Sequence, residues 1–149
     1  MFSKELLIFD GGFASQLVKD GHDIYDDPLW SARLLHSNPN VIKSTHRKFL
    51  EAGADAVISS SYQASLKGFE KYLNCSIEEA KELMKLSAKL VKDACEEFWQ
   101  VHQKDQAGTT FPGRQKPLAV ASLGPYGACL LDCSEYRGDY VDTVAAEVS

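Results

Sequence analysis

The sequence lacks long apolar runs and runs of basic residues. The apolar run nearest the start, 6–9, is closed by Asp10 and is too short for the core of a signal peptide or for a membrane span. No run of lysine and arginine exceeds two residues, and 16 basic against 21 acidic side chains give a formal charge of −5. The usual electrostatic basis for nucleic-acid binding is therefore missing. These absences predict a cytoplasmic protein that binds neither membranes nor nucleic acid.

The sequence also has few cysteines, and their spacing is irregular. The four are Cys75, Cys95, Cys129 and Cys133. In the absence of a secretory signal, we expect reduced thiols that serve mostly as packing residues. Cys129 and Cys133 form a C-x3-C pair with no second close pair and no nearby histidine, which is a weak zinc signal. Cysteine spacing therefore assigns no metal ligand.

What is present is the composition of one soluble globular domain: 149 residues, 44% hydrophobic and 25% charged. Continuous apolar runs over 6–9, 56–58 and 118–121 predict strands that are buried on both faces of a parallel sheet. The order of these runs and the helical segments between them predicts an α/β fold with right-handed crossovers.

The segments between the predicted strands have apolar residues at helical spacing. The pattern predicts a short helix over 13–20, a helix that Asn38 caps and Gly53 ends, and a long helix over 77–102. Ser76 and Glu79 have the spacing of a capping box at the start of the long helix. The polar stretch 104–116 is typical of a surface connection, and 140–148 has helical tendency.

Polar or glycine-rich residues follow each predicted strand: 10–12 (DGG), 59–63 (SSSYQ) and 124–127 (GPYG). Because βα loops converge at the carboxyl ends of parallel strands, these segments are the candidate site. The Asp10 carboxylate could receive a ligand ammonium group, although a helix N-cap role is equally open. The hydroxyls and amide of 59–63 could orient a polar substrate, whereas no histidine has the context of a catalytic triad. The 124–127 loop could equally be structural.

Three parallel strands leave two unpaired sheet edges, which invite association with another chain. Eight such β/α units close a barrel of about 250 residues. The sequence therefore predicts the first three β/α units of an incomplete (β/α)8 TIM barrel, with residues 1–149 as one partial domain.

Several segments resemble the homocysteine S-methyltransferase family, in the family's order and over nearly the whole chain. They are 7–14 (LIFDGGFA), 27–32 (DPLWSA), 52–55 (AGAD), 61–65 (SYQAS), 68–69 (GF), 122–128 (SLGPYGA) and 134–140 (SEYRGDY). The resemblance is greatest to the branch that uses S-methylmethionine or S-adenosylmethionine as the methyl donor, on the strength of Tyr62, Gln63 and Ala64.

The resemblance implies a (β/α)8 barrel that transfers a methyl group from a sulfonium donor to the sulfur of homocysteine, which gives methionine. It further implies that Asp10 and Gly11 hold the amino-acid part of homocysteine, with Ser61, Tyr62 and Gln63 near the substrate pocket. Zinc is the implied cofactor, since a free thiol is only slightly ionised at neutral pH and zinc binds the thiolate.

The resemblance places the family's zinc-binding cysteines, and a glutamate that helps to bind the amino group, on later strands, and none of the four cysteines here matches those positions. We therefore expect a zinc-dependent methyltransferase fragment that is inactive alone. Two alternatives stay open. One is a non-catalytic short isoform that associates with a full-length partner through the open sheet edges, and the other is an independent small α/β binding module.

Overall fold

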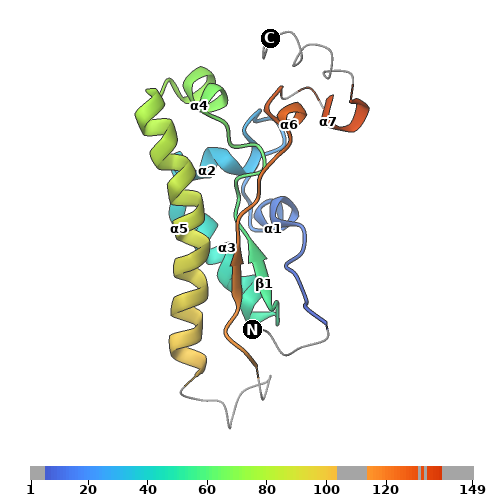
Figure 1. Ribbon diagram of the computed structural model, residues 1–149, viewed down its shortest axis with the longest axis vertical. Coiled ribbons are helices and arrows are strands. Elements are labelled where there is room, and N and C mark those ends of the chain that lie inside the picture. The colour runs from blue at the N-terminus through green and yellow to red at the C-terminus, as the bar shows by residue number, and fades with distance from the viewer. Residues whose placement is uncertain (1–5, 104–113, 131, 133, 139–149) are drawn as a thin grey trace, which may run out of the picture.

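The computed structural model describes residues 6–103, 114–130, 132 and 134–138. Its helices and strands form a mixed α/β structure with a small parallel sheet (Figure 1). In chain order the elements are α1 (Phe13–Lys19), the 3-10 helix η1 (Trp30–Ala32), α2 (Arg33–Ser37), α3 (Pro39–Glu51), β1 (Ala56–Ile58), α4 (Leu66–Leu73), α5 (Ile77–His102), β2 (Leu118–Val120), α6 (Tyr126–Leu130) and α7 (Ser134–Arg137).

The sheet consists of β1 and β2, which pair in parallel with Val57 opposite Ala119. The predicted strand over 6–9 is wrong in extent, because this segment makes only one bridge, between Phe9 and Ala56. The reason lies in Asp10: its side-chain Oδ2, and not a backbone carbonyl, accepts the N–H of Ile58 at 2.9 Å. Backbone pairing between the 6–9 segment and β1 therefore ends at Asp10, because the next N–H of β1, that of Ile58, donates to the Asp10 side chain.

Burial of the sheet also differs from the prediction. Leu118 is exposed, as are Leu6, Ile8 and Phe9, so the sheet is not covered on both faces along its whole length. In Figure 1 the long helix α5 runs along one side of the sheet and α1 lies on the other side. β1 is buried better than β2, because Ala56 and Val57 are buried whereas Leu118 and Ala119 are exposed. Helix α5 contacts both strands, and α3 contacts β1.

The predicted helices are confirmed as α1, α3 and α5. The capping box at the start of α5 is present, with the Ser76 side chain accepting from Glu79 N–H and the Glu79 carboxylate accepting from Ser76 N–H. Asn38 occupies the N-cap position of α3, but its side chain makes no capping hydrogen bond. Gly53 ends this helix with φ 108°, a conformation that favours glycine.

Two apolar clusters hold the layers together. One joins η1, α2, α3, α4 and α5 through Leu29, Ala32, Leu35, Ile42, Ala64, Phe69, Ala80 and Leu90. The other joins α3, β1 and α5 through Leu50, Ala54, Val57, Val91, Ala94, Cys95 and Phe98. Both clusters meet on α3 and α5, so these two helices fix the position of β1.

Four short helices were not predicted from the sequence: α2, α4, α6 and α7. The predicted helical segment at 140–148 and most of the connection at 104–116 lie outside the described residues. Of the helices in the described part of the chain, none is long and apolar enough to cross a membrane.

Candidate functional site

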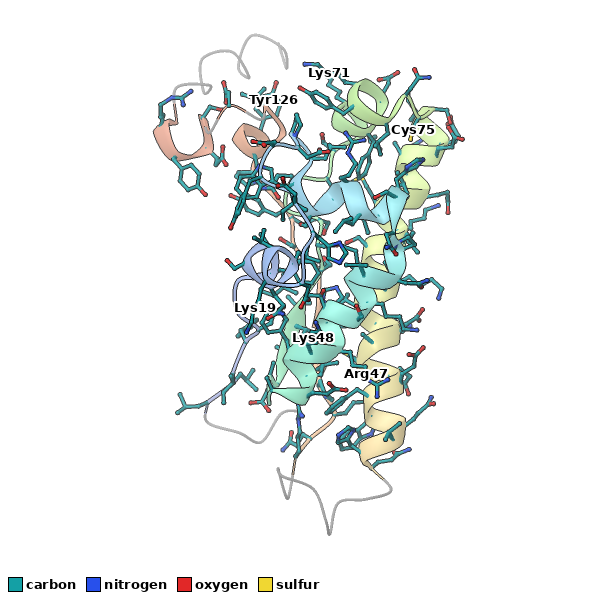
Figure 2. The ribbon with its side chains drawn as sticks, turned by 180° about the vertical axis from the view of Figure 1, so that it is seen from behind. Lys19, Arg47, Lys48, Lys71, Cys75 and Tyr126 are labelled. Atoms are coloured by element: carbon teal, nitrogen blue, oxygen red, sulfur yellow. The ribbon has the colours of Figure 1, made fainter. Side chains whose placement is uncertain are left out.

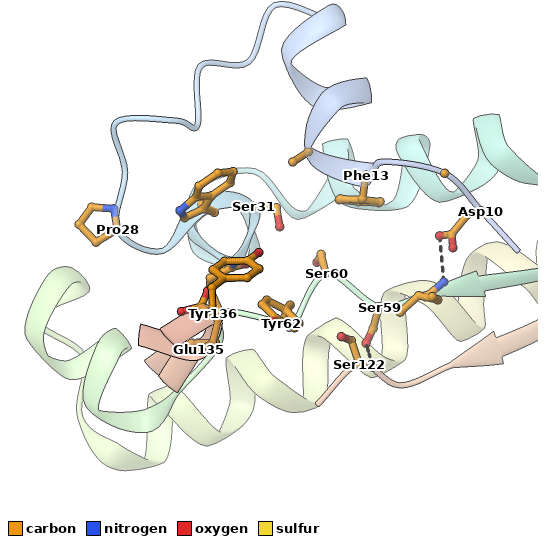
Figure 3. Close-up of a pocket in the computed structure, with 16 residues that line it drawn as sticks. Asp10, Phe13, Pro28, Ser31, Ser59, Ser60, Tyr62, Ser122, Glu135 and Tyr136 are labelled. Atoms are coloured by element: carbon orange, nitrogen blue, oxygen red, sulfur yellow. Dashed lines mark hydrogen bonds between the residues drawn. The ribbon is translucent and has the colours of Figure 1, made fainter. Parts of the chain in front are cut away.

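A pocket of about 510 Å³ lies beyond the carboxyl ends of β1 and β2, where the sequence predicted a site (Figure 3). It is lined by Asp10, Gly11, Phe13, Ala14, Pro28, Trp30, Ser31, Ile58, Ser59, Ser60, Tyr62, Gln63, Ser122, Ala128, Glu135 and Tyr136. These residues come from the loops after the 6–9 segment, β1 and β2, from the end of β1, from the segment before η1, and from α1, η1, α6 and α7. The pocket therefore depends on segments that are far apart in the sequence.

Asp10 is the acidic group held most firmly in this pocket. Its backbone N–H donates to the Ala56 carbonyl at 3.0 Å, and its Oδ2 accepts from Ile58 N–H at 2.9 Å. Burial raises the pKa of the Asp10 carboxyl above its usual value, and the hydrogen bond from Ile58 opposes this rise. The carboxylate is thus fixed in orientation at the edge of the sheet, next to Gly11, with burial disfavouring its charge.

The serines after β1 have different roles, which their hydrogen bonds separate. Ser122 N–H donates to Ser59 Oγ at 2.9 Å, and Ser61 Oγ donates to the Ser122 carbonyl at 2.8 Å. The Ser59 and Ser61 hydroxyls lie 2.7 Å apart. Because the Ser61 proton is used on the carbonyl, Ser59 must be the donor within this pair. The result is a closed ring, here called the serine ring, that ties the loop after β1 to the loop after β2.

Ser60 does not take part in the serine ring. The residue is only 5% exposed, it contributes to the pocket wall, and its hydroxyl has no hydrogen-bond partner in the described part of the chain. Ser60 lies in a bend just after β1, between the two serines whose hydroxyls bind each other and the Ser122 backbone.

The two loops approach each other closely at Gly124. A Cβ atom on Gly124 would lie 1.9 Å from the carbonyl oxygen of Tyr62, so a side chain there would displace the backbone. Tyr62 and Gln63 both line the pocket. Their position is therefore set by a contact that glycine alone allows.

Aromatic rings form much of the remaining wall. Trp30 has φ 48°, a left-handed conformation that is strained for a bulky residue. Its ring packs edge-on against the Tyr25 ring, with the ring centroids 5.5 Å apart. Asp27 stabilises this turn, because its Oδ1 accepts from Leu29 N–H at 2.8 Å and its Oδ2 binds the Arg33 guanidinium. The contacts of this turn thus hold the Trp30 indole ring at the pocket, although the left-handed backbone conformation of Trp30 is energetically unfavourable.

A second hollow, of about 570 Å³, lies at the start of α5 and is slightly larger. It is lined mainly by exposed charged side chains of one helix face, among them Glu78, Lys81, Glu82 and Lys85. The pocket at the strand ends combines several loops, aromatic rings and a fixed carboxylate, so we take it as the functional site.

Comparison with known proteins identifies the family of the chain. Residues 7–148 match the family model described as homocysteine S-methyltransferase. The chain belongs to the homocysteine S-methyltransferase family. Homocysteine S-methyltransferase 1 of Zea mays is 46% identical over 140 residues, which are 94% of this chain and 42% of that protein. The betaine-homocysteine S-methyltransferase of Drosophila melanogaster is 39% identical over 146 residues, which are 97% of this chain and 42% of that one.

A solved structure is similar as well. The metallated form of the homocysteine methyltransferase MmuM from Escherichia coli superposes with a TM-score of 0.76 at 38% identity, over 93% of this chain and 44% of MmuM. The chain therefore spans about two fifths of the length of the family members it matches.

The described residues do not fit a metal centre. Among them, no group of three or more histidine, cysteine, aspartate or glutamate side chains is placed to hold a metal ion. Cys75 and Cys95 are free and buried, as expected for packing residues, and neither lines the pocket. Burial raises the pKa of the Cys95 thiol to about 11, which disfavours the thiolate that metals bind. The side chains of Cys129 and Cys133 lie outside the described part, and no chemical step below runs through a metal.

The predicted site residues are brought together with one exception. Asp10, Gly11, Tyr62 and Gln63 all line the pocket, whereas Ser61 belongs to the serine ring and is not part of the wall. Prediction from the sequence did not single out Trp30, Ser31, Glu135 and Tyr136, which also line the pocket, whereas Ser60 belongs to the 59–63 stretch that it put forward. The four lie in the 27–32 and 134–140 segments that resemble the family, which was a signal of their location but not of their role. No local pattern separated Ser60 from its serine neighbours.

Proposed function

We propose that this chain is the amino-terminal, homocysteine-binding part of a (β/α)8 barrel enzyme that transfers a methyl group from S-methylmethionine or S-adenosylmethionine to homocysteine, giving methionine. The observation that carries the proposal is the fixed Asp10 carboxylate in a pocket at the strand ends of a family member. The free, buried thiols of Cys75 and Cys95 support a reducing compartment such as the cytoplasm.

Asp10 and Gly11 would hold the amino-acid part of homocysteine. The Asp10 carboxylate accepts the substrate ammonium in a charge-assisted hydrogen bond, and Gly11 lets the substrate approach the backbone. An ammonium at this position would also offset the burial that raises the pKa of Asp10. Tyr62 and Gln63 form the adjacent wall, and Ser61 supports them through the serine ring.

The aromatic wall suits a cationic methyl donor. A sulfonium centre carries positive charge on polarised methyl groups, and the faces of Trp30, Tyr62 and Tyr136 offer negative electrostatic potential. The reaction breaks the bond between methyl carbon and donor sulfur and forms one between that carbon and the homocysteine sulfur. The donor leaves as a neutral thioether, and the homocysteine thiol proton is released.

The test is a chimaera in which residues 1–149 replace the corresponding part of Escherichia coli MmuM. We expect methionine formation from homocysteine and S-methylmethionine, a loss of at least about tenfold in kcat/KM with Asp10→Ala, and no change with Ser44→Ala on the exposed surface of α3. A folded chimaera that binds no homocysteine would refute the proposal. The separate 149-residue chain is expected to show no turnover.

A second candidate function follows from the exposed sheet edge. Leu6, Ile8, Phe9 and Leu118 are exposed apolar side chains at or beside strand pairings, and such edges favour association. The chain would then be a non-catalytic partner of a longer family member. Co-purification of the tagged chain with such a protein, lost on Ile8→Lys and Leu118→Lys, would support it, and a monomeric chain in the presence of the longer protein would argue against it.

A further inference from the structure

The loop that follows Asp10 has little support from its own residues. Gly11 and Gly12 are exposed and have no side chains, and α1, which begins at Phe13, has no side-chain cap at Gly12. Glycine leaves the backbone free to adopt many conformations. Phe13 is therefore the first residue after Asp10 whose side chain can fix the loop, and it also lines the pocket (Figure 3).

Helix α3 supplies the surface on which this loop rests. The His46 ring packs against the Phe13 ring, with the centroids 4.8 Å apart and an angle of 40° between the ring planes. The Phe49 ring lies beside Gly11, since a Cβ atom on Gly11 would be 3.4 Å from Phe49 Cε1. Residues three apart share one face of a helix. One face of α3 therefore contacts the loop at two points, and both apolar clusters hold α3 in place.

The contact from His46 is made by the ring itself and not by a hydrogen bond. His46 is 0% exposed, and neither ring nitrogen has a hydrogen-bond partner among the described residues. Burial lowers the pKa of His46 to about 4, so the ring is neutral at pH 7. Aromatic rings favour tilted or offset contacts of the kind found here. An aliphatic side chain would not reproduce the flat surface that meets Phe13.

We propose that His46 is a positioning residue of the pocket, which holds the Phe13 ring in place and thereby fixes the 10–13 loop that carries Asp10. His46 is fully buried and is not part of the described wall, so it acts on a ligand only through Phe13. The contacts that carry the proposal lie between α3 and the loop, and they do not involve the other sides of the pocket. The effect on homocysteine rests on the proposed function, whereas the effect on the loop does not.

The first test measures the order of the loop in the 149-residue chain without ligand, by nitrogen NMR relaxation of Gly11 and Gly12. In wild type we expect backbone order parameters of about 0.8, and in His46→Leu a fall to about 0.6. His46→Phe keeps an aromatic ring and removes both nitrogens. It should leave the order parameters within about 0.1 of wild type.

The second test measures kinetics in the chimaera with Escherichia coli MmuM. His46→Leu is expected to lower kcat/KM for homocysteine about fivefold, mainly through a higher KM, and His46→Phe less than about twofold. A double-mutant cycle shows whether His46 acts through Phe13. In the Phe13→Leu background, His46→Leu should lower kcat/KM by less than a further factor of about two.

Leu50→Val separates positioning from general loss of stability. Leu50 is a buried residue of the same helix, in the cluster that joins α3, β1 and α5. The substitution removes buried packing and should lower the melting temperature. The order parameters of Gly11 and Gly12 should stay at the wild-type value, and kcat/KM should change less than about twofold.

Several results would overturn the proposal. Wild-type loop order in His46→Leu would show that the ring does not hold the loop. An equal loss of kcat/KM in the wild-type and Phe13→Leu backgrounds would show that His46 does not act through Phe13. A loss in Leu50→Val as large as in His46→Leu would assign the effect to stability alone. A folded chimaera without turnover would refute the proposed function, and the loop order of the His46 variants would then decide the proposal by itself.

Discussion

The two ends of the parallel sheet are built differently. At the amino end, Arg114 donates to the carbonyls of Leu50 and Ala54, and its guanidinium lies 4.5 Å from the centre of the Phe98 ring. At the carboxyl end, Ser60 is a buried hydroxyl with no partner in the described chain, and Trp30 is strained. At the amino end the Arg114 side chain is hydrogen-bonded within the fold, whereas at the carboxyl end the Ser60 hydroxyl has no such bond among the described residues.

Asp55 also forms hydrogen bonds at the amino end of the sheet. Its Oδ2 accepts from Ile8 N–H at 3.1 Å, and its backbone carbonyl accepts from Leu118 N–H at 2.8 Å. Burial lowers the pKa of the Arg114 guanidinium, and the nearby Asp55 charge opposes that shift. One short region therefore joins the 6–9 segment, β1, β2 and the carboxyl end of α3. In parallel α/β proteins, ligands bind at the carboxyl ends of the strands, which leaves the opposite end free to stabilise the fold.

The largest expected effect tests the amino end. Arg114→Met removes two hydrogen bonds to carbonyls at the end of α3 and the favourable charge there, so we expect the free energy of unfolding to fall by about 4 kcal/mol. Urea denaturation measures it. Arg47→Met is the control, because Arg47 lies exposed on α3 (Figure 2) and its ion pair among the described residues is with the exposed Glu51. A loss below about 1 kcal/mol for Arg114→Met would contradict the structural role.

The next effect concerns His46, which packs against the pocket residue Phe13 with ring centroids 4.8 Å apart. Burial lowers its pKa from 6.5 to about 4. In the unfolded chain the imidazole gains its proton near pH 6.5, whereas in the folded chain it resists protonation until about pH 4. Stability is therefore full above pH 6.5 and falls by up to about 3 kcal/mol as the pH decreases to 4.

Urea denaturation at pH 7 and pH 4.5 measures this dependence. Other groups also titrate in this range, so the informative quantity is the difference between wild type and His46→Leu, in which the histidine contribution is absent. His36→Gln, at an exposed histidine, should keep the wild-type dependence. Parallel pH dependences for wild type and His46→Leu would show that His46 does not resist protonation in the folded chain.

A smaller effect is expected at the contact between the two loops of the carboxyl end. Gly124→Ala places a Cβ atom against the Tyr62 carbonyl, and the loops must separate to relieve the overlap. We expect a loss of about 2 kcal/mol in unfolding free energy, together with weaker homocysteine binding. Gly138→Ala serves as the comparison, because no atom of the described residues lies within 4 Å of the added Cβ and the positive φ of 75° is the feature that favours glycine there. Unchanged binding in Gly124→Ala would separate this contact from the site.

The smallest effect on stability, and a large one on binding, is expected at Asp10. Burial raises the pKa of the Asp10 carboxyl, so the folded state binds the carboxyl proton more tightly than the unfolded state does. When the pH rises through the raised pKa of the folded state, the carboxyl loses this proton, and the buried charge then lowers the stability of the fold. Asp10→Asn removes the charge while an oxygen can still accept from Ile58. The melting temperature at pH 7 should be equal or higher, while homocysteine affinity falls at least about tenfold. A marked fall in the melting temperature would mean that Asp10 serves the fold and not the ligand.

Parts of both the fold and the site were accessible from the sequence. The capping box at Ser76 and Glu79 and the glycine at 53 are local signals, so α5 and the end of α3 were predicted correctly. The strand over 6–9 was overestimated, because an apolar run does not reveal that Asp10 will take the N–H of Ile58. Short helices such as α4 were missed, because eight residues give too little periodicity beside their loops.

The sequence by itself determined the alternation of helices with apolar runs, the family to which the chain belongs, and the position of Asp10 after the first run. These follow from local periodicity and from motifs that are read in order. Only the tertiary structure decided which of three adjacent serines has no hydrogen-bond partner among the described residues, because Ser59 and Ser61 bind Ser122, which is 61 to 63 residues away. Hydrogen bonds between distant segments leave no local pattern, and the availability of Ser60 depends on them.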